Sequence, residues 1–341
     1  SRKLIDRLPF FYGWIVLISV CFAGFSRQGP AVATLSIFVT PMTTEFGWSR
    51  TAISGAVSLG GVLAALLSPS IGSYLDRKGA RVVLCFAVLS TAATTMLLSL
   101  TESIFVFYIL FCFARMNFAG PYDLGIYGAV NNWFIRRRGF ATAVVNLAQM
   151  AGLMAMPIIA QIAILFSNWR GGWLAIGLTI LLVGFIPVWF FMIRRPEDVG
   201  LQPDGHFSEP SNPENTLQKP QQPTDPTFSR KQAMSTPAFW LLSLFTVLVY
   251  PVQAGVSLHQ APHLIECGLN PTVAATVVST FSCISAVVGF GLGFWPSRFP
   301  LRIVLAATGI ALGTSSLMML NISSRTRVLP TPQKKCVEDC P

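Results

Sequence analysis

Three ionisable residues stand in stretches of the chain that are otherwise almost wholly apolar. Arg27 lies in the first of these stretches, and Arg115 and Asp123 lie within residues 104–133. A charged side chain inside a bilayer is costly, so it faces a protein interior or a water-filled cavity. Two cations and one anion leave an excess of positive charge, which favours a carboxylate over an amine or a sugar. Arginine also binds carboxylates in a bidentate fashion. The pattern indicates a cationic site for a small anion.

The spacing along the chain limits which of these groups share a helix face. In a continuous helix, Arg115 and Tyr122 are seven residues apart and lie about 20° from each other around the axis. Asp123 is about 12 Å along the axis from Arg115, too far for direct pairing. We expect Arg115 and Tyr122 to contact the anion and Asp123 to carry a coupled proton. The alternatives are structural: Arg115 could bond helix carbonyls, and Asp123 could anchor its helix.

Arg27 is the second candidate for binding the anion. It lies about 22 Å from the start of its stretch, and the following Gln28-Gly29-Pro30 would open the helical backbone to a cavity. The alternative is an arginine that snorkels toward the outer interface. Asn131 and Asn146 are expected to line the cavity, or else to bond only neighbouring helices. We predict no metal and no cofactor.

These side chains are carried by segments long enough to cross a bilayer. The chain has 341 residues, of which 52% are hydrophobic and 11% are charged, whereas soluble domains have about 25% charged residues. A crossing takes about 20 apolar residues, and the sequence therefore predicts an all-α, polytopic membrane helix bundle of about nine transmembrane helices. The predicted crossings are residues 12–39, 50–75, 82–100, 104–133, 140–166, 172–193, 237–262, 271–295 and 301–322.

Basic residues between these segments gather on one side of the predicted membrane. The opposite side has only Arg50 and Arg170 before the C-terminal tail. Because basic loops remain in the cytoplasm, the N-terminus is predicted to be cytoplasmic. The same placement argues against nucleic acid as the partner of a chain with net charge +10. The basic clusters on the predicted cytoplasmic side are at residues 2–7, 77–81, 136–138, 194–195 and 298–302.

The predicted helices divide the chain into four parts. Residues 1–195 form a half of six transmembrane helices, and residues 237–322 form a partial second half of three. Residues 196–236 are rich in proline and polar residues and predict a disordered cytoplasmic linker. Residues 323–341 are a polar tail.

The loop after the second predicted helix carries the most specific motif. It has Gly72, Asp76, Arg77, Gly79 and Arg81 at fixed spacing. It resembles the signature loop between helices two and three of major facilitator superfamily transporters, where the loop is a cytoplasmic gate latch. The resemblance implies a gating role for these five residues. The alternative is a basic turn without such a role.

Further segments resemble one branch of that superfamily, the monocarboxylate and oxalate/formate carriers. They are residues 11–14, 45–50, 133–139, 168–173 and 194–201. A second, eroded copy of the loop motif at residues 293–302 has Ser297 in place of the aspartate, as expected of two homologous halves. The resemblance implies transport of small organic anions with protons or by exchange. Such carriers have twelve helices, and this chain is predicted to have about nine.

We therefore expect an integral, multi-pass protein of the cell membrane that transports small, monocarboxylate-like anions by alternating access. Its partners would be the anion, the lipid bilayer and protons; it would not be an enzyme. The alternative is a truncated, non-transporting protein that acts as an assembly partner or is an inactive variant. Three further helices in the coding region beyond Asn321 would favour the carrier.

Overall fold

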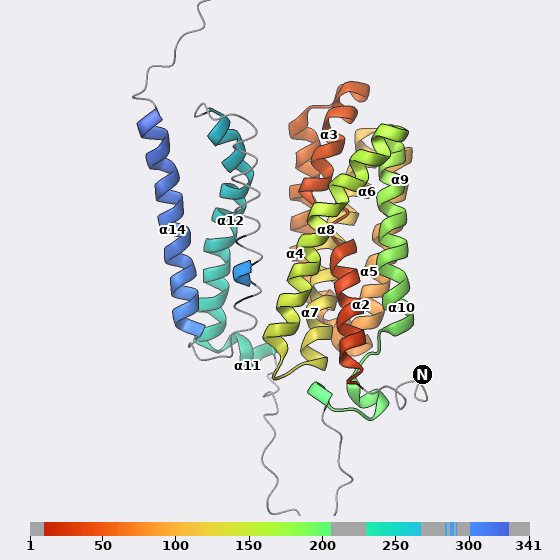
Figure 1. Cartoon of the computed structure of the whole chain (residues 1–341), viewed down its shortest axis with the longest axis vertical. Helices are drawn as coiled ribbons and strands as arrows, with labels where there is room; N and C mark the ends of the chain where they lie inside the picture. The colour runs from red at the N-terminus through yellow and green to blue at the C-terminus, as the bar shows by residue number, and fades with distance from the viewer. Residues whose placement is uncertain are drawn as a thin grey trace, which may run out of the picture. The chain divides into compact units, whose positions relative to one another are not determined.

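The computed structural model describes residues 10–205, 230–266, 287–289 and 301–326, together with positions 284 and 291. Every regular element in these residues is helical, so the prediction of an all-α fold is confirmed. The chain separates into two compact units (Figure 1). The first unit contains every described element up to residue 205, and the second contains α11, α12 and α14.

The helices of the first unit follow the predicted segments closely, with boundaries that differ by a few residues. Five spans are long and apolar enough to cross a membrane: Arg50–Lys78, Ala80–Leu100, Ile104–Trp133, Arg138–Phe166 and Trp169–Phe191. The elements are α2 (Gly13–Ser26), α3 (Val32–Phe46), α4 (Arg50–Lys78), α5 (Ala80–Leu97), η1 (Leu98–Leu100), α6 (Ile104–Ala119), α7 (Pro121–Trp133), α8 (Arg138–Phe166), α9 (Trp169–Thr179), the π-helical η2 (Ile180–Phe185) and α10 (Ile186–Phe191).

The first predicted crossing, residues 12–39, is two helices instead of one. α2 ends at Ser26, Ala31 has an extended backbone, and α3 then continues to Phe46. The break contains Pro30, which has no backbone N–H to donate to the helix. The opening expected at Gln28-Gly29-Pro30 is therefore present, and Arg27 stands at the C-terminal end of α2.

A second break interrupts the crossing predicted at residues 104–133. Gly120 has φ −116° and ψ −90°, which ends α6, and Pro121 begins α7. Proline is favoured in the first turn of a helix, where its missing N–H costs nothing. The prediction of one continuous helix is wrong at this point, because the break lies between Arg115 and Tyr122.

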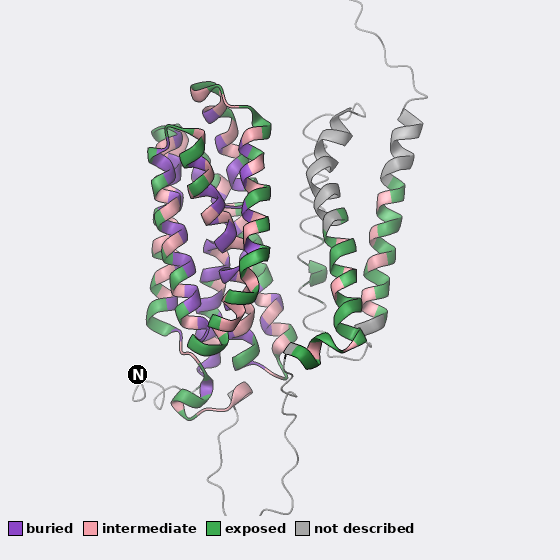
Figure 2. Cartoon of the chain, turned by 180° about the vertical axis from the view of Figure 1, so that it is seen from behind, coloured by how far each residue is buried: buried purple, intermediate pink, exposed green. Residues whose placement is uncertain are grey.

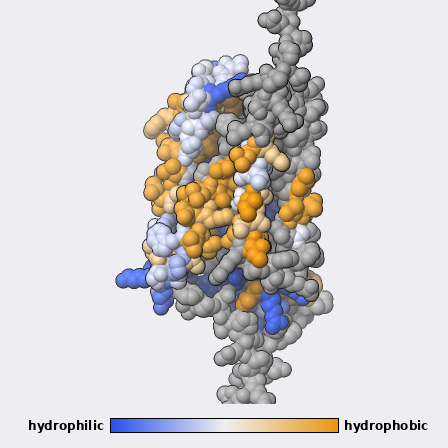
Figure 3. All heavy atoms as spheres, turned by 90° about the vertical axis from the view of Figure 1, so that its left-hand side faces the viewer, coloured by the Kyte–Doolittle hydropathy of each residue, from blue (hydrophilic) through white to orange (hydrophobic). Residues whose placement is uncertain are grey.

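Large aromatic side chains fill the centre of the first unit. Trp133, Trp173, Phe38 and Phe111 are fully buried, and the rings of Phe38 and Trp173 stack with centroids 3.8 Å apart. Buried residues occupy the inner faces of the helices, while exposed ones cover the outside (Figure 2). Many outward-facing residues of this unit are themselves large and apolar. On the face of the chain that Figure 3 shows, apolar side chains gather between hydrophilic groups that lie toward its ends. An apolar outside is what a bilayer-spanning bundle requires.

The second unit contains α11 (Arg230–Met234), α12 (Pro237–Glu266) and α14 (Leu301–Thr326). α12 and α14 match the predicted crossings at 237–262 and 301–322, and α14 continues four residues into the predicted polar tail. The crossing predicted at 271–295 and the eroded motif at 293–302 lie largely outside the described residues, as does most of the tail.

The predicted linker begins with an ordered segment. After α10 the chain forms two short turns, η3 (Pro196–Val199) and η4 (Pro203–Gly205). Both carboxylate oxygens of Asp204 accept backbone N–H groups, from Ile135 (3.1 Å), Arg136 (2.7 Å) and Arg137 (3.4 Å). Consecutive N–H groups before a helix form a natural anion site, so this carboxylate ties residues 196–205 to the start of α8.

Candidate anion site

Arg27 is held by acceptors from three different helices. Its Nε donates to the Phe118 carbonyl (2.9 Å), its Nη1 to Oε1 of Gln149 (2.9 Å), and its Nη2 to Oδ2 of Asp123 (2.6 Å). The Arg27 and Asp123 side chains are 11% and 33% exposed. Arg27 therefore does not snorkel, because its guanidinium joins α2 to α6, α7 and α8 inside the bundle.

The two helix breaks explain why this arrangement forms. Phe118 is in the last turn of α6, where carbonyls have no partner within the helix. Asp123 is in the first turn of α7, where the positive end of the helix dipole favours a carboxylate. Arg27 caps the C-terminal end of α2, where a cation is favoured. The free carbonyl at the end of α6 and the carboxylate at the start of α7 therefore both accept hydrogen bonds from the cation at the end of α2.

The Phe118 ring contacts both buried guanidinium groups. The Cζ atom of Arg27 is 3.9 Å from the ring centroid, and Cζ of Arg115 is 4.1 Å from it. A cation over an aromatic face is attracted by the ring quadrupole, most strongly where water is excluded. Phe118 therefore stabilises two like charges that would otherwise repel each other across a short gap.

Arg115 differs from Arg27 in its hydrogen bonding. Its Nε and Nη1 atoms are buried and have no hydrogen-bond partner among the described residues. Its stem packs against α4 at Gly60, where an added Cβ would lie 2.6 Å from Cβ of Arg115. Packing fixes the stem, and these two guanidinium nitrogens are left without an acceptor.

Polar side chains continue from this cluster along α7 and α8. Tyr127, one turn after Asp123, donates its hydroxyl hydrogen to Oδ1 of Asn146 (3.0 Å), one turn before Gln149. Asn131 follows one turn later on α7 and is exposed, as is Asn146. Residues four apart share a helix face. Asn131 and Asn146 thus lie on a polar stripe that leads to Arg27, without contacting Arg115.

Tyr122 does not share this surface. Its side chain is fully buried in the hydrophobic core. The break at Gly120 lies between Tyr122 and Arg115, so the two residues are not on one continuous helix. The Tyr122 hydroxyl is buried without a hydrogen-bond partner among the described residues, and its contact with a ligand stays a prediction.

The predicted gating loop is a tight turn between α4 and α5. Gly79 has φ +85°, a conformation that suits glycine, and a Cβ there would collide with the side chain of Arg194. Arg194 Nη2 donates to the Arg77 carbonyl (2.7 Å), and Arg81 Nη2 donates to the Trp189 carbonyl (2.7 Å). The turn is therefore fastened to α10 and to the residues that directly follow it.

The two remaining motif residues lie on α4 and make no such contact. Gly72 is half-buried with open space around its Cα, and Asp76 is exposed with no ion pair among the described residues. The gating role of all five residues stays a prediction.

Phe118 was not predicted as a site residue, and Gln149 was not predicted to bind Arg27. Gln149 lies where α8 faces Arg27, and Phe118 lies between the arginines. The three-residue spacing of Arg115 and Phe118 and of Asn146 and Gln149 was a usable signal for shared faces. The spacing of residues along the sequence does not show that α2, α6 and α8 contact one another around Arg27.

These features define a class of protein. Apolar, outward-facing helices of crossing length surround a small charged cluster, which is the architecture of an integral, multi-pass membrane protein. The chain belongs to the Major Facilitator Superfamily, whose family model matches residues 16–329. The family resemblance predicted from the loop at residues 72–81 is therefore confirmed.

Known relatives include a membrane sensor and several transporters. The chain is 28% identical over 269 residues to the membrane sensor protein UhpC of Salmonella typhimurium, covering 74% of this chain and 58% of the sensor. It is 23% identical over 216 residues to the oxalate:formate antiporter of Oxalobacter formigenes, covering 61% and 45%. It is 25% identical over 172 residues to a probable L-galactonate transporter of Escherichia coli, covering 50% and 37%. The chain thus spans less than two thirds of the length of these relatives.

Proposed function

We propose that the protein is a secondary transporter of small organic anions and that Arg115 binds the carboxylate of the solute. The observation that carries the proposal is the pair of buried, unpartnered nitrogens on Arg115, beside an Arg27 whose donors are already satisfied among the described residues. Buried N–H groups without acceptors are costly. A visiting carboxylate would supply the missing acceptors together with a countercharge.

The charges of the cluster support the same solute class. Arg27 and Arg115 face one carboxylate, Asp123, so the cluster keeps one net positive charge when no solute is bound. A monoanion neutralises it, whereas an amine would add repulsion. Two similar proteins have names that contain organic anions, oxalate and formate in one and L-galactonate in the other. Membership of the monocarboxylate branch is a narrower hypothesis and is not needed for this proposal.

Asp123 provides a means of coupling transport to protons. When it is ionised, it occupies Nη2 of Arg27 at 2.6 Å. Protonation would remove that countercharge and free Arg27 to turn toward a second oxygen of the anion. Proton entry would then accompany solute binding, as symport requires. We place this cycle in the cell membrane with the N-terminus in the cytoplasm, following the distribution of basic residues, and we expect no enzymatic activity.

Uptake into proteoliposomes tests the proposal. The purified chain is reconstituted, and initial uptake of labelled oxalate, formate and L-galactonate is measured for the native chain and for Arg115→Gln. We expect Arg115→Gln to lower uptake at least tenfold, because it removes the charge and the donor fork. Uptake by Arg115→Lys should lie between that of the native chain and that of Arg115→Gln, since lysine keeps the charge but lacks the planar set of donors. Arg50→Gln, at an exposed position at the start of α4, is the control and should transport normally. Unchanged uptake in Arg115→Gln would remove Arg115 from the mechanism.

A second candidate function is sensing without transport. It is favoured by the match to UhpC, which is named a membrane sensor protein, and it fits the alternative of a non-transporting assembly partner. Solute-dependent thermal shifts on the same preparations separate the two. Binding that depends on Arg115 without uptake supports a sensor, and binding together with uptake supports a carrier.

A further inference from the structure

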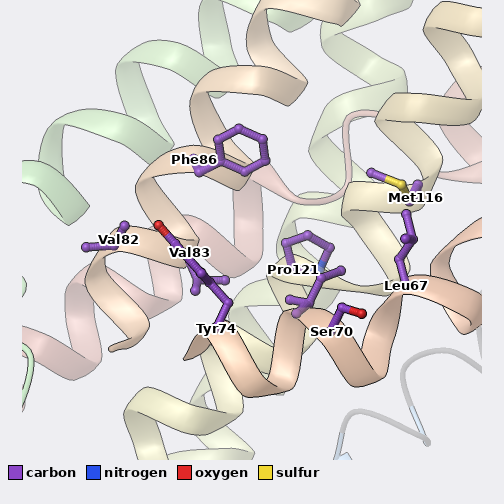
Figure 4. A pocket seen from close by; sticks show the side chains of 9 residues that line it. Leu67, Ser70, Tyr74, Val82, Val83, Phe86, Met116 and Pro121 are labelled. Atoms are coloured by element: carbon purple, nitrogen blue, oxygen red, sulfur yellow. The ribbon is translucent and has the colours of Figure 1, made fainter. Parts of the chain in front are cut away.

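A groove opens on the first unit, and none of its lining residues belongs to the arginine cluster. It has a volume of about 510 Å³ and lies where α4, α5 and the junction of α6 with α7 meet. Leu67 and Tyr74 form one wall, Val82 and Phe86 the other, and Pro121 lies at the base (Figure 4). Tyr74 and Phe86 are 48% and 58% exposed, so the groove is open to the surroundings.

The junction of α6 with α7 forms the base of this groove. α6 ends at Ala119 and α7 begins at Pro121, so the groove lies beside the helix break at Gly120. The side chains of Met116 and Pro121, one on each side of the break, complete an almost wholly apolar lining. An apolar groove within the membrane-spanning part of a bundle is suited to an acyl chain.

A cation stands at one end of the groove. Leu67, Ser70, Ile71 and Tyr74 all line it, and their spacing makes them one stripe of α4. Lys78 is one turn beyond Tyr74 and about 30° from the middle of that stripe. It is exposed and is the last residue of α4. Its ammonium group can therefore reach the membrane surface directly above the apolar groove.

The other charges near this end do not cancel that cation. Asp76 lies about 170° away from the middle of the stripe, on the opposite side of α4. Arg81 is directed toward α10, where it donates to the Trp189 carbonyl at 2.7 Å. Arg77 is exposed close by and adds positive charge. The groove thus pairs apolar walls with a positively charged mouth.

We propose that this groove binds one anionic phospholipid, with an acyl chain between α4 and α5 and its phosphate at Lys78. The lipid comes from the leaflet at the Gly79 turn, the predicted cytoplasmic one. Anionic headgroups are attracted to basic residues at the membrane surface on that side. The apolar walls hold the chain, and the lysine selects for charge on the headgroup. Binding does not depend on Arg115 or on any transported solute.

Lipid titration of the purified chain in detergent tests the site. The probes are fluorescent phosphatidylglycerol and fluorescent phosphatidylcholine of equal chain length, followed by anisotropy. Lys78→Gln should weaken phosphatidylglycerol binding about fivefold, the effect of one basic residue at a membrane surface, and leave phosphatidylcholine unchanged. Arg50→Gln, at the other end of α4, should leave both unchanged.

Blocking the groove gives an independent readout. Ser70 is exposed and lines the groove, so Ser70→Trp should fill it without disturbing the core and abolish saturable binding of both lipids. Leu59→Trp, at an exposed position on α4 about 12 Å from Leu67, is the control and should bind both lipids normally. Equal affinity for the two lipids, or unchanged binding in Ser70→Trp, would overturn the proposal.

Discussion

Arg27 and Asp123 illustrate how a charged pair is stabilised inside an apolar bundle. Arg27 does not rely on Asp123 alone, because it also donates to a backbone carbonyl and to Gln149, and stacks on Phe118. Breaking a buried pair by removing one partner costs more than removing both, since the remaining charge is left uncompensated. Measured couplings within membranes are nevertheless modest. The pair should therefore couple measurably without dominating the stability of the bundle.

A double-mutant cycle measures this coupling. Arg27→Gln and Asp123→Asn should each lower the thermal midpoint in detergent, and the double variant should be at least as stable as the less stable of the two single variants. The expected coupling free energy is on the order of 1 kcal/mol. Combining Arg50→Gln with Asp123→Asn is the control and should give additive effects. Additivity in the Arg27–Asp123 cycle would show that the pair adds no stability.

At the level of helices, close contact depends on glycines at particular positions. Gly60 and Gly61 are neighbours in α4 and share the same backbone conformation, but their surroundings differ. A Cβ on Gly60 would lie 2.6 Å from Cβ and 2.8 Å from Cγ of Arg115, whereas a Cβ on Gly61 would have nothing within 4 Å. Gly60 thus sets how near α4 approaches α6, and it holds the stem of Arg115 in place.

Replacing Gly60 or Gly61 with alanine should change the stability of the protein differently. Gly60→Ala should destabilise the protein by about 1–3 kcal/mol, because α4 and α6 must move apart. It should also weaken anion binding by displacing Arg115. Gly61→Ala should be neutral or stabilise by up to about 1 kcal/mol, since alanine has less freedom in the unfolded chain. Thermal midpoints and solute-dependent shifts measure both; equal destabilisation by the two changes would contradict a specific contact at Gly60.

The positions of the helices could be predicted from the sequence, but most contacts between the helices could not. Apolar length is local information, and α4, α8 and α12 begin within about three residues of their predicted starts. Pro30 also marked the break after α2. The break at Gly120 was missed, because glycine is tolerated within membrane helices and Pro121 can equally continue or begin one. The contact of Arg27 with Asp123 depends on both breaks and on how the helices pack, which the spacing along a single chain does not contain.

On the scale of the whole first unit, the first and last helices are joined at both ends of the bundle. At one end, the Tyr12 hydroxyl donates to the Phe191 carbonyl at 2.8 Å. At the other, Glu45 at the end of α3 accepts hydrogen bonds from Trp169 Nε1 and from Arg170 Nη1, the latter at 2.6 Å. The guanidinium of Arg170 also lies over the ring of Trp169, 4.4 Å from its centroid. These contacts join the first predicted crossing to the sixth and close that side of the bundle at both ends.

The stability that the hydrogen bonds to Glu45 contribute should depend on pH. The hydrogen bond from Trp169, followed by that from Arg170, holds the pKa of Glu45 below its ordinary value of 4.5 in the folded protein. A carboxyl with a lowered pKa stabilises the fold above its unfolded pKa, and this contribution is lost as the pH falls through the folded value. Glu45→Gln should therefore lower the thermal midpoint by a few degrees at most at pH 7, and the difference from the native chain should shrink as the pH falls below 4.5 and vanish below the folded pKa of Glu45. Glu102→Gln, at an exposed position with no ion pair among the described residues, is the control. A Glu45→Gln difference that persists unchanged in acid would mean that packing of Trp169, and not the carboxylate, closes the bundle at that end.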